Sequence, residues 1–162
     1  MCERAAGARR SPRWTDPDGS HHWLVVPDWQ RLADTAPAVA IGFFGQAREN
    51  VEHGPIITRE HEILARADGL QGLLAYHNVR FADGQWGNLV VFASADDPSR
   101  LRADPVHVEA IGLTPRHYHS LRLHVGTLEL GALGEAEPRL IHTLYLDFAT
   151  PPWRAMRYYT EA

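Results

Sequence analysis

Short apolar runs separated by turn residues dominate the chain, and their length and alternation are typical of β-strands. The clearest runs cover residues 38–48, 70–81, 86–94, 119–130 and 139–149. Asp83-Gly84 stands between the second and third runs, and this dipeptide favours the tight turn of a β-hairpin. The pattern therefore predicts five strands, two of them joined as a hairpin.

Two segments between these runs are predicted to be helical. Residues 56–68 have apolar residues near helical spacing, and Gly69 follows where a helix C-cap is expected. In residues 95–118, the pairs Asp97-Pro98, Asp104-Pro105 and Thr114-Pro115 each place a capping side chain before a proline suited to the first helical position. This second segment is therefore expected to restart its helix three times. A short helix is also expected at 29–33, after Asp28.

The order of these elements predicts an α+β protein with a ferredoxin-like β-α-β-β-α-β antiparallel sheet and an extra C-terminal strand. Residues 1–20 carry Pro, Gly, Asp and Ser without a hydrophobic period and are expected to be a flexible tail. Residues 21–162 are expected to form one α+β domain. Within it, the segment from residue 153 onward is expected to be an aromatic tail.

The charge and composition exclude several classes of partner. The formal charge is -4 and the isoelectric point is about 6.2, whereas nucleic-acid-binding domains are usually basic. No apolar stretch approaches the roughly 18 residues of a transmembrane helix, and no secretory signal is present. The one cysteine, Cys2, permits no disulfide within the chain. We therefore expect a cytoplasmic protein that binds neither nucleic acid nor membrane.

Three histidines fall on predicted apolar strand faces. His119 alternates with Leu121 and Leu123, while His77 and His142 each alternate with aliphatic residues of their own strands. Neutral imidazole is both a common metal ligand and a common general base near neutral pH. Three in one cavity could thus bind a metal with an open position or transfer protons. The alternative for each is a core histidine that a neighbouring hydrogen bond satisfies.

Further candidate residues lie on the helical segment and on the hairpin strands. His107 is expected at the edge of a helical apolar stripe, where its ring can face a cavity. Tyr76, Asn78 and Asn88 are polar groups on hydrophobic strands and could orient a ligand, with Trp86 as an aromatic wall. The alternative is an ordinary polar outer face of an antiparallel sheet. A nucleophile elbow, a P-loop, a Rossmann glycine pattern and an HExxH motif are all absent from the sequence.

Residues 86–112, "WGNLVVFASADDPSRLRADPVHVEAIG", resemble the strand–turn–helix stretch of antibiotic biosynthesis monooxygenase-like proteins, the dimeric α/β-barrel superfamily. The spacing of His107 and Ala110 matches the helix of that family. The resemblance implies a homodimer built as a dimeric α/β barrel, with a pocket between each sheet and its helices. The haem-degrading branch of the family has an Asn on the first strand, whereas residues 38–48 contain none.

Together, the residues and the resemblance lead to three hypotheses. The first is a small-molecule tailoring enzyme that oxygenates or cyclises a hydrophobic aromatic or polyketide-like substrate. His119 and His107 would transfer protons, and His77, Asn78, Asn88, Tyr76, Trp86 and His142 would bind the substrate. The second is a haem-binding protein or haem-dependent enzyme with His107, His119 or His142 as axial ligand. The third is a non-catalytic ligand-binding dimeric module, so the expected cofactor is either none or haem.

Overall fold

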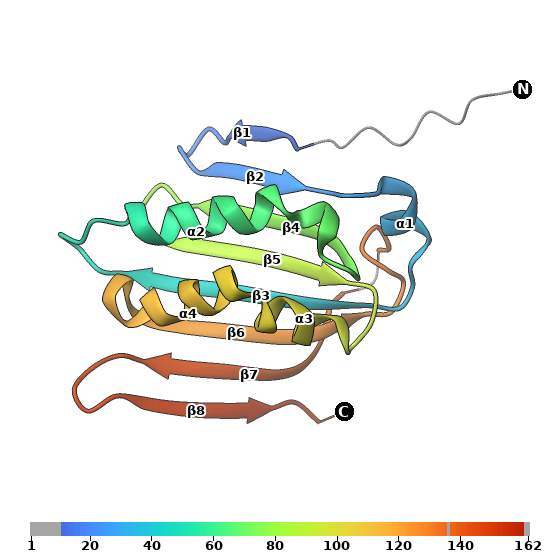
Figure 1. Ribbon diagram of the computed structural model, residues 1–162. Helices are drawn as coiled ribbons and strands as arrows, with labels where there is room; N and C mark the ends of the chain where they lie inside the picture. Colours follow the sequence, from blue (N-terminus) through green and yellow to red (C-terminus); the bar gives the residue numbers. More distant parts are fainter. Residues whose placement is uncertain (1–10, 136, 161–162) are drawn as a thin grey trace, which may run out of the picture.

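All strands of the described chain join one antiparallel sheet. The computed structural model describes residues 11–135 and 137–160. Its strands are β1 (Arg13–Thr15), β2 (His21–Val25), β3 (Ala38–Ala47), β4 (Leu73–Arg80), β5 (Trp86–Phe92), β6 (Tyr118–Leu128), β7 (Arg139–Asp147) and β8 (Trp153–Tyr158). They form an eight-stranded sheet in the order β1-β2-β4-β5-β3-β6-β7-β8 (Figure 1). The predicted hairpin at Asp83-Gly84 is present as the connection between β4 and β5.

This sheet shows that the predicted fold class was wrong. A ferredoxin-like β-α-β-β-α-β fold with one extra strand has a short sheet, whereas β1, β2 and β8 widen this one at both edges. The dimeric α/β barrel that the resemblance implied is wrong for the same reason. These edge strands gave little signal, because every residue of β1 and of β8 is exposed and no hydrophobic alternation marks them.

The two predicted tails, residues 1–20 and the segment from residue 153 onward, both contain edge strands of the sheet. Residues 13–15 pair with β2, and residues 153–158 pair with β7, so neither stretch is a tail. The predicted tail before residue 11 lies outside the described residues.

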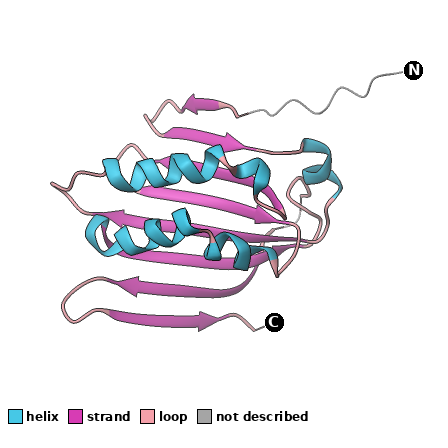
Figure 2. Ribbon diagram, viewed as in Figure 1, coloured by secondary structure: helices cyan, strands magenta, loops and turns pink. Residues whose placement is uncertain are grey.

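Three helices cover one face of the sheet, which we call the helix face (Figure 2). They are α2 (Gly54–Ala65), α3 (Asp97–Ala103) and α4 (Pro105–His117). The predicted restart at Asp104-Pro105 is confirmed, since the Asp104 carboxylate accepts hydrogen bonds from the N–H groups of Val106 and His107. The predicted restart at Thr114-Pro115 is wrong, because α4 continues through Pro115. In the described residues no helix has the length and apolar character needed to span a membrane.

Buried side chains form two clusters, one on each side of the sheet. The larger cluster joins the helix face to the helices and includes Leu64, Phe92 and Leu101. The second contains Val91 and Leu32, which belongs to α1 (Trp29–Asp34). Since Val91 alternates with Phe92, α1 covers one end of the opposite face. We call that opposite face the open face, because helices α2 to α4 do not cover it.

Two β-bulges decide which side chains reach the helix face. In β6, Ser120 pairs with Gln46 and Tyr118 pairs with Ala47, so His119 is an extra residue. In β4, Leu73 pairs with Phe92 and Ala75 pairs with Val91, so Leu74 is an extra residue. An extra residue reverses the alternation of side chains along the strand that contains it.

Candidate active site

A cavity of about 270 Å³ lies between the helix face and helices α2, α3 and α4. Its walls are mainly aliphatic and aromatic, and they include Ile41, Phe43, Ile57, Val90, Leu121 and Leu123. The polar groups in this wall are few: Glu60 on α2, Tyr76 and Asn88 on the sheet, Tyr118 at the start of β6, and Arg102, His107 and Thr114 on α3 and α4. Apolar walls with a few placed polar groups are typical of small-molecule sites.

Glu60 is the most perturbed acid of this cavity. Burial among apolar walls raises the pKa of its carboxyl group to about 7, because a low-dielectric environment disfavours the charged form. Asn78 donates a hydrogen bond from Nδ2 to Oε1 of Glu60, and the Tyr76 hydroxyl also hydrogen-bonds this carboxyl group. Both bonds act against the burial effect, and burial prevails. Glu60 therefore gains and loses its proton near neutral pH.

The two tyrosines remain protonated donors beside this acid. Burial, followed by the charge of Glu60, raises the pKa of Tyr76 well above its usual value and raises that of Tyr118 as well. Asn88 donates from Nδ2 to the Tyr76 hydroxyl at 3.0 Å, which leaves the Tyr76 proton free to point to Glu60. Tyr76 is thereby fixed in place, with Asn88 on one side and Glu60 on the other.

His107 lines the cavity from the first turn of α4. Burial lowers the pKa of its ring; the Asp104 carboxylate opposes this effect, and the Arg102 guanidinium reinforces it. The ring is therefore neutral at physiological pH. Its Nδ1 atom is buried and has no hydrogen-bond partner.

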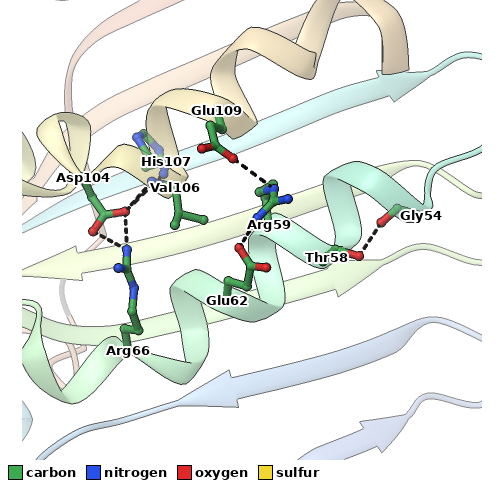
Figure 3. Close-up of polar contacts among 9 residues, drawn as sticks. All are labelled: Gly54, Thr58, Arg59, Glu62, Arg66, Asp104, Val106, His107 and Glu109. Carbon is green, nitrogen blue, oxygen red and sulfur yellow. Dashed lines mark hydrogen bonds and ion pairs between the residues drawn. The ribbon is translucent and has the colours of Figure 1, made fainter.

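Two ion pairs hold α2 and α4 side by side next to this cavity. Arg59 Nε lies 3.3 Å from Glu109, and Arg66 Nη2 lies 2.5 Å from Asp104 (Figure 3). Along the chain, Glu60 lies between the two arginines, and His107 lies between the two acids. Both Glu60 and His107 line the cavity from these paired helices.

The structure brings together only some of the predicted site residues. Tyr76, Trp86, Asn88 and His107 line the cavity, and Asn78 contacts Glu60. His119, the extra residue of the β6 bulge, is exposed and accepts a hydrogen bond from Arg48 at 3.2 Å in a separate polar cleft.

His77 and His142 also lie away from the cavity. His77 is on the open face, where its Nε2 is 3.0 Å from Nδ1 of His22 and its ring stacks with Trp14. His142 is on β7, with its ring against Tyr158 of β8. The proposed grouping of His77, His119 and His142 in one cavity is therefore wrong.

This arrangement of histidines gives little support to the hypotheses of a metal site or a haem site. In the part of the chain that the structure describes, no group of three or more His, Cys, Asp or Glu side chains is placed to bind a metal. Of the three histidines named as haem ligands, only His107 lines the cavity. Haem binding through His107 stays a prediction.

Sequence analysis missed Glu60, although the sequence carries a signal for it. Glu60 is four residues after Ile56, three before Ile63 and four before Leu64, so it sits within the apolar stripe of α2. A carboxylate inside an apolar stripe is a candidate for a perturbed pKa. Tyr118 was missed because the β6 bulge changes the face on which alternation places it.

Comparison with known proteins shows the fold alone. No protein-family model matches this chain, and no curated protein matches it. A solved structure of a protein of unknown function from Nitrosomonas europaea, NE2512, is similar with a TM-score of 0.52 and 14% sequence identity. The match covers 64% of this chain and 99% of that protein. The resemblance of residues 86–112 to the monooxygenase-like family, and the homodimer it implies, stay predictions.

Proposed function

We propose that this protein is an enzyme that transfers a proton to or from a hydrophobic small molecule, with Glu60 as the acid–base residue. The observation that carries the proposal is a carboxyl group of pKa about 7 inside an apolar cavity. A general base works best when its pKa is near the working pH, and apolar burial is a common means of raising a carboxyl pKa to that range.

The step assigned to Glu60 is simple. Its carboxylate takes a proton from a C–H group, the bonding electron pair moves into the substrate, and the carboxylic acid later returns the proton to another atom. Isomerisation and cyclisation both need such a step. The cavity of about 270 Å³ is near the lower end of the usual range of ligand sites, about 300–1,000 Å³, which favours a compact ring-sized substrate.

Asn78 and Tyr76 position the acid. Their hydrogen bonds hold the Glu60 side chain against the sheet and favour its charged form, so they prevent burial from raising the pKa beyond the useful range. The proposal thus retains proton transfer in a cavity, as the sequence suggested, and assigns it to a glutamate in place of His119.

The test uses a nitrobenzisoxazole, a compact aromatic probe that a carboxylate base opens. The base removes the ring C–H proton, the electron pair forms a nitrile as the N–O bond breaks, and the released cyanophenolate absorbs visible light. We expect turnover that rises with pH through about 7. Glu60→Gln should lower kcat/KM by about 100-fold or more, the usual range for a lost general base.

Glu52→Gln is the matched control, because it removes an exposed glutamate from the loop before α2. It should leave turnover unchanged. Circular dichroism should confirm that both variants fold. Equal turnover in the wild type and in Glu60→Gln, or a wild type that does not accelerate ring opening, would refute the proposal.

A further inference from the structure

His107 shares the cavity with Glu60 but has no role in the proton transfer described above. One of its ring nitrogens, Nδ1, is buried without a hydrogen-bond partner. A buried N–H group left unpaired in this position is costly, whereas an unpaired lone pair is tolerated better. The favoured tautomer therefore places the lone pair on Nδ1 and the proton on Nε2, so Nε2 is the hydrogen-bond donor of this ring.

The location of His107 keeps this ring neutral. It is the third residue of α4, and the positive end of the helix dipole disfavours a cationic imidazolium there. Burial and Arg102 lower its pKa further, against the opposing charge of Asp104. A neutral imidazole with a donor nitrogen polarises a carbonyl oxygen without carrying a charge of its own, as neutral histidine does in triosephosphate isomerase.

Glu60 and His107 also line the same cavity, Glu60 from α2 and His107 from α4, where Figure 3 shows His107 beside the Arg66–Asp104 ion pair. A base and a neutral hydrogen-bond donor in one apolar cavity suit one kind of reacting group. A C–H bond next to a carbonyl is acidic enough for a carboxylate of pKa about 7 once the carbonyl oxygen accepts a hydrogen bond.

We propose that His107 donates a hydrogen bond from Nε2 to the carbonyl oxygen of the substrate, so that the substrates of this cavity are compact enolisable carbonyl compounds. This inference rests on the proposed function of Glu60. Glu60 removes the proton from the carbon next to the carbonyl, the C–H electron pair moves to give an enolate, and the negative charge develops on the oxygen that His107 holds. The proton then returns from Glu60 to carbon. Alternatively, the enolate carbon attacks a second carbonyl and closes a ring, and the alkoxide formed from that carbonyl takes the proton back from Glu60.

The experiment measures the carbonyl stretch of bound acetophenone labelled with ¹³C at the carbonyl, by difference infrared spectroscopy. In the wild type, the band should shift to lower frequency than in an apolar solvent, because a hydrogen bond weakens the C=O bond. His107→Phe should abolish this shift, and His107→Gln, which keeps an N–H donor, should retain part of it. His119→Phe is the matched control and should leave the shift intact.

Each outcome has a definite meaning. Failure of acetophenone to bind, an unshifted band in the wild type, or a shift that persists in His107→Phe would overturn the inference. A shift lost in Tyr118→Phe but kept in His107→Phe would do so too. Naphthalene binding, followed by isothermal titration calorimetry, confirms that the cavity of each variant is intact. Glu60→Gln should keep the shift while losing turnover, so failure of the Glu60 proposal is visible separately.

Discussion

Asn78 on β4 donates a hydrogen bond to Glu60 on α2, which joins the sheet to the helix at the candidate catalytic acid. Both residues are polar groups among apolar neighbours, and without Glu60 the amide of the buried Asn78 would lose this hydrogen-bond partner. Because the bond stabilises the charged carboxylate, it holds the pKa of Glu60 below the value that burial alone would set.

Asn78→Leu removes this donor while keeping a side chain of similar size. The pKa of Glu60 should rise above about 7, because burial is then opposed by Tyr76 alone. A hydrogen bond to a charged group contributes about 1.5–3 kcal/mol, which corresponds to a rise of about one to two pH units. The pH midpoint of nitrobenzisoxazole turnover measures it. An unchanged midpoint would show that Asn78 does not control the acid.

Glu60 also makes folding stability depend on pH. The pKa of Glu60 is about 7 in the folded protein, against 4.5 as the reference value for an unfolded chain. The folded state therefore holds its proton more tightly, and stability falls as the pH rises from about 4.5 to about 7. At 1.36 kcal/mol per pH unit, the loss reaches up to about 3 kcal/mol. Urea unfolding at pH 5 and pH 8 measures it.

Glu60→Gln should remove this part of the pH dependence, since an amide does not titrate. The difference in unfolding free energy between pH 5 and pH 8 should shrink by up to about 3 kcal/mol. Glu52→Gln, the exposed control, should keep the wild-type difference. If both variants behave alike, the carboxyl group of Glu60 is not perturbed in the way that we describe.

The sequence predicted those elements that have a local signal in the pattern of apolar and turn residues, and it missed those that do not. The five central strands, the hairpin at Asp83-Gly84 and the restart at Asp104-Pro105 are present, because apolar patterning and proline-cap chemistry are local signals. The edge strands β1 and β8 depend on pairing with β2 and β7, which no local pattern reveals. The fold class was wrong for this reason.

The site predictions failed at the bulges. Simple alternation grouped His119 with Leu121 and His77 with Leu73. His119 is itself the extra residue of β6, and in β4 the extra residue Leu74 lies between Leu73 and His77. Tyr118 therefore faces the cavity with Leu121, and His77 faces away from it. Neither bulge has a glycine or proline at the extra position. The sequence alone therefore carried no sign that the side chains change from one face of the sheet to the other at these points.

Gly45 on β3 shapes the cavity and can be tested. A Cβ atom at this position would lie 2.5 Å from Cε1 of Tyr118 and 2.9 Å from the Phe43 ring, and both rings line the cavity. Gly45→Ala should therefore displace these rings. We expect a loss of about 1–3 kcal/mol in stability and about tenfold weaker naphthalene binding. Urea unfolding and isothermal titration calorimetry with naphthalene measure the two effects.

Gly112→Ala is the control for that change. Gly112 lies in α4, and nothing lies within 4 Å of a Cβ atom built there. The substitution should leave naphthalene binding unchanged and should stabilise the helix by up to about 1 kcal/mol, since alanine has the higher helix propensity. Tight binding in Gly45→Ala would mean that Tyr118 and Phe43 do not define the cavity wall.

His77 and His119, two histidines that lie outside the cavity, provide the last prediction: only His77 should matter for stability, and neither should matter for turnover. His77→Ala removes a ring that contacts Trp14 and His22 on the open face, so stability should fall by about 1–2 kcal/mol. His119→Ala removes an exposed side chain and should change stability by less than about 0.5 kcal/mol. Because neither residue lines the cavity, both variants should keep nitrobenzisoxazole turnover within about twofold of the wild type. A large loss of turnover in His119→Ala, with folding intact, would assign proton transfer to the polar cleft at the start of β6 and not to Glu60.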